Sequence, residues 1–178
     1  MLQITIPSVE YYDSVKEEFV EAKETTIRLE HSLLSLSSWE SKWNKPFLSS
    51  EKSAEEVLDY IRCMTLTQNV DPRVYTRLTK ENIEAINNYI DAPMTATTFT
   101  TDNKVSKKET ITAEIIYYWM IASNIPFECQ KWHLNKLLTL IKVCSIKNAP
   151  PKKMSKRKTM TNNAAINAAR RQALGTRG

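Results

Sequence analysis

The sequence predicts a mainly α-helical domain of the α+β class, in which a small N-terminal β-hairpin precedes a helical bundle around a buried hairpin of two helices. Three observations lead to this prediction: alternating apolar residues near the N-terminus, capping residues ahead of helical periodicities, and the longest apolar runs between Glu114 and Asn148. The 178 residues suffice for one domain and a tail. We place the domain at residues 1–149 and the tail at residues 150–178.

Two segments near the N-terminus are expected to form the hairpin. Leu2–Ile6 alternates in polarity and stops at Pro7, and the segment from Phe19 to Leu29 is rich in β-branched and polar residues. An acidic connection, residues 11–18, would join the two strands. Because a two-stranded hairpin is marginal alone, it must pack on helices or pair with another chain.

Helical segments follow the hairpin. The spacing of leucine and tryptophan predicts a helix over residues 31–44. Ser53, with Glu56 three residues later, has the capping-box pattern that begins a second helix. A short turn or helix over residues 71–78 and a helix capped at Thr79 come next.

The stretch over residues 93–108 is the least helical part of this region. Within it, Thr95–Thr101 is compatible with a strand that pairs with the hairpin and equally with a loop. Thr110 or Thr112 is then the cap of the central helix.

The central hairpin of two helices is predicted from the apolar runs. Residues 115–122 are apolar on every face, which indicates a helix buried all round that is too short to cross a bilayer. Pro126 ends this helix. The apolar stripe of the helix expected to cover it consists of Leu134, Leu137, Leu138, Ile141 and Cys144.

Charge is distributed unevenly along the chain. Residues 1–128 contain 13 Lys and Arg against 20 Asp and Glu, a net charge of −7. Residues 129–178 contain 12 Lys and Arg and no acid, a net charge of +12. This asymmetry predicts attraction within the chain, between copies, or to an anionic partner. Residues 163–174 have good helix propensity but little to bury, so we expect a firm helix only when the tail is bound.

Composition disfavours several kinds of site. The only glycines, Gly175 and Gly178, lie at the end, whereas phosphate-binding loops need glycine for close backbone approach. The three cysteines lack a CxxC pair, which predicts reduced thiols and no zinc site. His133 is more typical of a hydrogen-bonded structural histidine than of a general base, and Cys129 is more typical of a small buried residue than of a nucleophile. A nucleophile–base set of His31 with Glu30 and Ser32 is disfavoured, because sequence neighbours rarely face each other on one element. We expect no enzyme, no metal or other cofactor, no signal peptide and no membrane-spanning segment.

The candidate partner-binding residues form two groups. Trp39, Trp43 and Phe47 would line a partner groove if they are exposed, although their spacing favours core packing. The basic residues of the tail are suited to an acidic protein surface or to phosphates, with a strong salt dependence in the second case. They are Lys152, Lys153, Lys156, Arg157, Lys158, Arg170 and Arg171.

Five strings of the sequence resemble a family of small proteins of tailed bacteriophages, associated with the structural and tail-assembly part of the phage genome. They are LEHSLLSLSSWESKWNKPFL, DYIRCMT, MTATTF, EIIYYWMIASNIPFECQKWHLNKLLTLI and ARRQALGTRG, and the likeness runs over nearly the whole chain. The resemblance implies a role in phage morphogenesis, and the label it suggests is tail assembly chaperone, which keeps the tape measure protein soluble until tail tube subunits polymerise around it.

Two alternatives remain open beside the chaperone. One is a virion structural subunit, namely a neck, connector or tail-tube-associated protein. As a homo-oligomer, it would interlock the acidic and basic halves of different copies. The other is a nucleic-acid-binding protein that acts through the basic tail. The expected location is the host cytoplasm during assembly, or the virion for a structural subunit.

Overall fold

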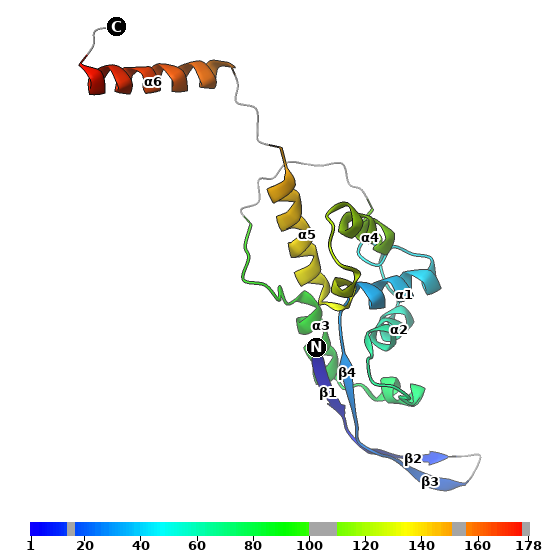
Figure 1. Ribbon diagram of the computed structural model, residues 1–178. Coiled ribbons are helices and arrows are strands. Elements are labelled where there is room, and N and C mark those ends of the chain that lie inside the picture. The colour runs from blue at the N-terminus through cyan, green and yellow to red at the C-terminus, as the bar shows by residue number, and fades with distance from the viewer. Residues whose placement is uncertain (14–16, 100–109, 151–155, 176–178) are drawn as a thin grey trace. The chain divides into compact units, whose positions relative to one another are not determined.

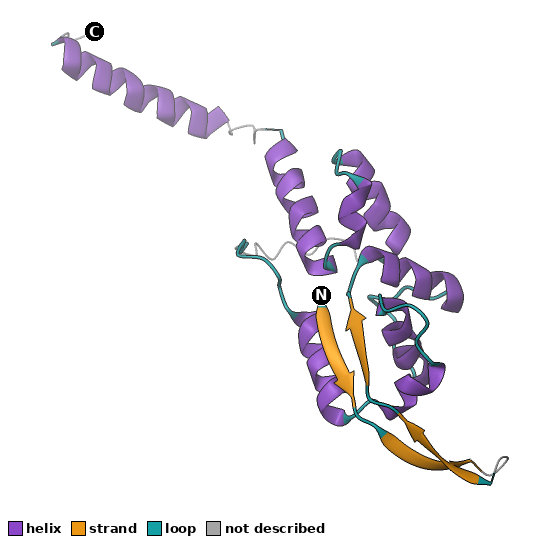
Figure 2. Cartoon of the chain, turned by 60° about the horizontal axis from the view of Figure 1, so that its bottom comes forward, coloured by secondary structure: helices purple, strands orange, loops and turns teal. Residues whose placement is uncertain are grey.

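The computed structural model describes residues 1–13, 17–99, 110–150 and 156–175. The chain divides into two compact units, Met1–Ile146 and Lys147–Gly178. Helices dominate, and short strands occur only near the N-terminus of the described chain (Figure 2). The predicted mainly α-helical α+β class is therefore confirmed.

The first unit opens with strands and continues with helices (Figure 1). The strands are β1 (Leu2–Ile6), β2 (Val9–Asp13), β3 (Glu18–Ala22) and β4 (Thr25–Leu29). The α-helices and 3-10 helices that follow are α1 (Leu33–Trp43), α2 (Ala54–Met64), η1 (Pro72–Arg77), α3 (Lys80–Asp91), α4 (Ala113–Ala122), η2 (Phe127–Lys131) and α5 (Leu134–Asn148). The second unit contains α6 (Lys156–Leu174).

The N-terminal hairpin is longer than expected and is divided into two sheets of two strands. β1 pairs antiparallel with β4, and β2 pairs antiparallel with β3. The expected acidic connection, residues 11–18, is therefore partly strand, because its first residues belong to β2 and Glu18 begins β3. Pro7 lies between β1 and β2 and has no N–H to donate to a ladder, which interrupts the pairing between the two sheets.

The β1–β4 sheet supplies one wall of the core. Its buried face consists of Ile4 and Ile6 from β1 with Ile27 and Leu29 from β4, and β1 packs against α3. The end of β4 is also bonded to the end of α2, because the Glu30 N–H donates to the Met64 carbonyl at 2.9 Å. The hairpin thus packs on helices, as a two-stranded sheet of this size requires.

Local signals set the beginnings of α1, α2 and α3. Each begins with a reciprocal capping box, at Ser32, Ser53 and Thr79 respectively. The cap at Ser53 with Glu56 is the one that the sequence predicted in full, with Ser53 Oγ accepting from the Glu56 N–H at 3.3 Å. Thr112 precedes α4 but makes no side-chain capping bond.

The first unit is organised around α1 instead of the predicted central helix. α1 packs against α2, α4 and η2, and its Leu33, Leu36 and Trp39 are fully buried. α4 buries only one face, and Tyr118 and Ile121 on its other side are 66% and 59% exposed. The prediction that residues 115–122 are buried all round is therefore wrong, because a helix buries only the stripe that faces its neighbours.

The helix α5 follows the predicted stripe and is anchored to the end of α3. Leu134, Leu137 and Ile141 are buried. Asn135 Nδ2 donates to the carbonyl oxygens of Ile90 and Ala92, at 3.0 and 2.8 Å. Between α3 and α4, the described residues 92–99 form a loop without a strand. The loop alternative therefore holds for residues 95–99, whereas Thr100 and Thr101 lie outside the described residues.

Candidate protein-interaction surfaces

The β2–β3 sheet extends beyond the helices of the first unit, and we refer to it as the arm (Figure 2). The register places Glu10 opposite Glu21 and Tyr12 opposite Phe19. These four side chains share one face, because alternate residues of a strand point to the same side. The rings of Tyr12 and Phe19 meet edge to face, with centroids 5.2 Å apart.

Exposed aromatic rings of this kind are uncommon on a surface without a partner. Tyr12 is 54% exposed and Phe19 is 75% exposed. Glu10 and Glu21 are exposed as well, and neither forms an ion pair with a described residue. Large apolar side chains rimmed by polar ones are typical of an interaction surface.

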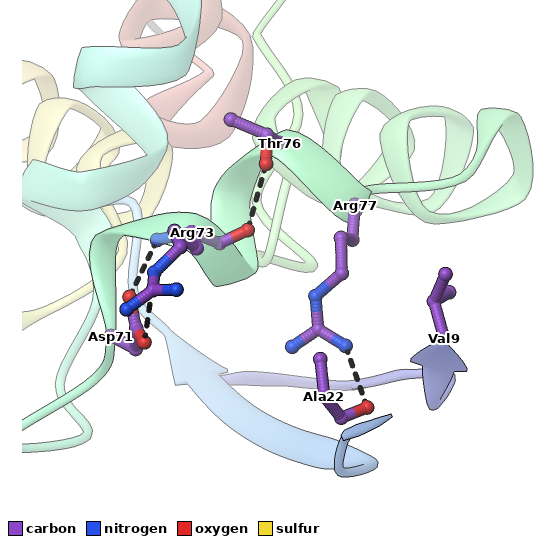
Figure 3. Close-up of a pocket in the computed structure, with 6 residues that line it drawn as sticks. All are labelled: Val9, Ala22, Asp71, Arg73, Thr76 and Arg77. Atoms are coloured by element: carbon purple, nitrogen blue, oxygen red, sulfur yellow. Dashed lines mark hydrogen bonds and ion pairs between the residues drawn. The ribbon is translucent and has the colours of Figure 1, made fainter. Parts of the chain in front are cut away.

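The base of the arm is held by Arg77 at the end of η1 (Figure 3). One guanidinium nitrogen, Nη1, donates to the carbonyl oxygens of Pro7 at 3.0 Å and Ala22 at 3.2 Å. These two carbonyls lie on opposite strands of the hairpin, at the interruption between the two sheets. Arg77 therefore fixes both strands where the arm begins.

A cavity of about 300 Å³ lies at the same place, between the base of the arm and η1 (Figure 3). Its lining consists of Val9, Ala22, Asp71, Arg73, Thr76 and Arg77. Asp71 accepts the Arg73 N–H at 2.9 Å and caps η1. Arg77 Nε is buried, and no described residue accepts a hydrogen bond from it.

The predicted aromatic groove is instead part of the core. Trp39 is fully buried and donates its Nε1–H to the Glu56 carbonyl at 2.8 Å, and Phe47 is 8% exposed and packs edge to face on Trp39. Trp43 is only partly buried, and its Nε1–H donates to Asp59 Oδ2 at 2.9 Å. The condition for a groove, exposure of all three rings, is not met, because α1 packs this side against α2.

Buried acids beside these rings are paired. Lys42 and Lys45 form ion pairs with Asp59 and Glu56 respectively. Burial acts to raise the pKa of Asp59, but hydrogen bonds from Lys42 and Trp43 outweigh it and hold the pKa below its ordinary value. The hydrogen bond from Lys45 is the main cause of the lowered pKa of Glu56. These acids therefore stabilise the fold and are not free to bind a partner.

The two histidines meet in the core as structural groups. His31 and His133 lie edge to face with ring centroids 5.2 Å apart. His31 Nδ1 is hydrogen-bonded to Tyr60 Oη at 2.6 Å, and His133 Nε2 to the Tyr89 carbonyl at 2.9 Å. Burial, followed by the nearby His133, lowers the pKa of His31 to about 4. The prediction of a hydrogen-bonded, structural His133 is confirmed.

The second unit offers a basic helix. Every described side chain of α6 is exposed, among them Arg157, Arg170 and Arg171 together with the apolar Met160 and Ile166. Of the other basic residues predicted to bind a partner, Lys156 and Lys158 belong to the first turn of α6. Lys152 and Lys153 lie outside the described residues.

Sequence reasoning missed the arm and its support. The missed residues are Glu10, Tyr12, Phe19, Glu21 and Arg77. Val9, Tyr11 and Tyr12 are of residue types enriched in strands and were the available signal for β2, but Glu10 and Asp13 are of types depleted in strands. No local sequence pattern indicates the role of Arg77, because the residues that accept its hydrogen bonds lie 70 and 55 positions away in the chain.

No protein-family model, no curated protein and no solved structure matches this chain. Within the described residues, no group of three or more His, Cys, Asp or Glu side chains is placed to hold a metal ion. The helices of that part of the chain include none with the length and apolar character needed to span a membrane. The surfaces of the chain itself, together with the phage family expected from the sequence, are therefore the basis on which a function can be proposed.

Proposed function

We propose that this chain is a tail assembly chaperone of a tailed bacteriophage, which acts by binding the tape measure protein and not by catalysis. The observation that carries the proposal is α6, a helix of 19 residues whose described side chains are all exposed. The sequence resemblance supplies the phage context.

The physical argument concerns how such a helix is stabilised. Most helices in proteins gain their stability from packing an apolar face. The exposed apolar side chains of α6, Met160, Ile166 and Leu174, have no such packing among the described residues. A client that covers them would stabilise the helix, and the exposed arginines would add attraction to acidic side chains of the client.

Coexpression with the tape measure protein of the encoding phage tests the proposal. The wild-type chain should keep the client in the soluble fraction, and the pair should co-elute in gel filtration. Arg170→Glu with Arg171→Glu should lose this effect. Lys80→Glu with Lys131→Glu, also at exposed positions, is the matched control and should retain it. Equal solubility of the client with and without the chain would contradict the proposal.

A virion structural subunit is the second candidate, and the exposed arm favours it, because a projecting two-stranded sheet is suited to contacts between neighbouring subunits. Quantitative mass spectrometry of purified virions separates the two. Stoichiometric presence in the particle would refute the chaperone. Absence from particles, together with abundance in the infected-cell lysate, would refute the structural subunit.

A nucleic-acid-binding protein is the third candidate, and the net charge of +12 over residues 129–178 favours it. Binding through phosphates would weaken steeply with salt. It should also disappear when the basic cluster is neutralised at Lys152, Lys153, Lys156, Arg157 and Lys158. Salt-insensitive binding, or binding that survives neutralisation, would refute this candidate.

A further inference from the structure

The arm is a sheet that can accept another strand. β2 and β3 pair with each other, and no further strand of the described chain pairs with either of them. Their outer edges therefore carry backbone N–H and C=O groups that are templates for an additional strand. The Ala22 carbonyl is an exception, since it accepts from Arg77. A third strand would also stabilise the arm, because two strands alone are marginal.

One face of the arm carries a regular pattern of side chains, and we call it the arm face: Glu10, Tyr12, Phe19 and Glu21. The carboxylate pair and the ring pair lie next to each other along the strands. Residues on one face of a strand repeat every ~7 Å. An extended segment that joins either edge would place its own alternate side chains at the same interval beside the arm face.

Charge decides which segment fits. Glu10 and Glu21 are directly opposite each other, and like charges in that arrangement are unfavourable. A second copy of the arm would add further carboxylates at the same positions, so self-pairing in register is disfavoured. A basic strand would instead place a cation beside the carboxylates, and an arginine guanidinium also stacks on aromatic rings such as those of Tyr12 and Phe19.

We propose that the arm binds an extended segment of a partner protein by strand addition, and that the segment presents arginine at alternate positions to Glu10, Tyr12, Phe19 and Glu21. The edge supplies backbone hydrogen bonds, which are independent of sequence. The arm face supplies the selection for positive charge. Arg77, bonded to both strands, holds the arm at its base so that this surface is presented by the folded unit.

The test uses the full-length chain and a fluorescein-labelled peptide that alternates arginine with valine and threonine. A second peptide carries glutamate in place of arginine. Fluorescence anisotropy at low ionic strength measures binding. Glu10→Gln with Glu21→Gln should weaken binding of the arginine peptide about 2- to 30-fold, since two exposed ion pairs are lost. Glu84→Gln with Glu128→Gln removes two exposed carboxylates outside the arm and should leave binding unchanged.

If neutralising Glu10 and Glu21 disturbs the structure of the arm, reversing their charge still tests the proposal. Glu10→Lys with Glu21→Lys should lose the arginine peptide and gain the glutamate peptide, an exchange that unfolding does not produce. Slower amide exchange of residues 9–13 and 18–22 on binding should report the added strand. Equal binding by the wild-type and neutralised chains, or no binding of the arginine peptide at millimolar concentration, would overturn the proposal.

This inference does not depend on the phage function. Arg170→Glu with Arg171→Glu, the change that should abolish client binding by α6, should leave binding of the arginine peptide intact. A chain that binds the peptide but fails to solubilise the tape measure protein would therefore refute the proposed function alone.

Discussion

The buried carboxylate of Glu40 connects two distant segments to α1, and its removal is a direct test of the fold. Glu40 lies in α1 and is 7% exposed. Its Oε1 accepts the Phe47 N–H and its Oε2 accepts the Ala113 N–H, both at 2.7 Å. One side chain thus links α1 to the segment that follows it and to the first turn of α4, where a negative charge also favours the helix dipole.

The cost of Glu40→Ala follows from the two donors left behind. A buried donor without a partner costs about 1–3 kcal/mol, so the two N–H groups together cost about 2–6 kcal/mol. This is a large part of the total stability of an ordinary domain, about 5–15 kcal/mol. Glu40→Gln should cost less, about 1–3 kcal/mol, because the amide oxygen still accepts one of the two bonds.

Urea unfolding followed by far-UV circular dichroism measures both variants. With a dependence of about 2 kcal/mol per M urea, Glu40→Ala should lower the midpoint by roughly 1–3 M. Glu84→Ala, an exposed glutamate in α3, is the control and should change the free energy of unfolding by less than about 0.5 kcal/mol. If Glu40→Ala is as mild as this control, the link between α1 and α4 is not a stabilising one.

Three further predictions concern the core. Trp39→Ala should destabilise the first unit by about 3–5 kcal/mol in the same urea assay, because a fully buried ring and its bond to the Glu56 carbonyl are lost; a near-neutral result would contradict its place in the core. Asp59→Asn should cost about 1–3 kcal/mol, because the carboxylate is 4% exposed and accepts from Trp43; equal stability of the variant would argue against that pairing. His31, with a pKa lowered to about 4 from an ordinary value of 6.5, contributes stability that is complete above pH 6.5 and lost as the pH falls to about 4, by about 3 kcal/mol. Urea unfolding across that range should show this loss in the wild type and a flatter profile in His31→Phe, and identical profiles would refute the linkage.

The parts of the fold that sequence reasoning recovered are those set by neighbouring residues. Ser53 and Glu56 are three positions apart, and the pattern that predicted a capping box is the one that forms it. The stripe of α5 was likewise visible as a periodicity, and Leu134, Leu137 and Ile141 are buried as it indicated. Both signals depend on helix geometry alone.

The parts that were missed depend on contacts between distant segments. The apolar residues of α4 gave no indication of which face α1 would cover, so Tyr118 and Ile121 were expected in the core. Apolar composition identifies the residues that can be buried, but it does not show how much of a neighbouring element is available to cover them. Glu40 was similarly invisible as a link, because Ala113 lies 73 residues away in the chain.

The candidate site was affected in the same way. Trp39 and Phe47 were singled out as aromatic residues, but the structure buries them. Tyr12, which lies in the expected connection, and Phe19, which lies in the expected second strand, are exposed. The aromatic type alone does not distinguish a core ring from a binding ring. The pairing of β2 with β3 places Tyr12 and Phe19 next to each other on one exposed face.

Burial also changes the meaning of the charge asymmetry. Several acids of the first 128 residues, among them Glu40, Glu56 and Asp59, are buried and already accept hydrogen bonds. The negative charge that remains accessible includes that of Glu10 and Glu21 on the arm, which form no ion pair with a described residue. The arginines of α6, Arg157, Arg170 and Arg171, are exposed, and the sequence of that helix contains no acid.

Under the two proposals above, the arm and α6 would bind partners of opposite charge, and the two contacts would be chemically independent. Besides its carboxylates, the arm offers a partner a free strand edge and a pair of aromatic rings. Besides its arginines, α6 offers exposed apolar side chains. Exposed charges are screened over about 10 Å at 0.1 M salt, so salt should weaken both contacts. The backbone bonds of an added strand are much less sensitive to salt, and binding by the arm should therefore retain a larger fraction of its affinity than binding by α6 as salt is raised.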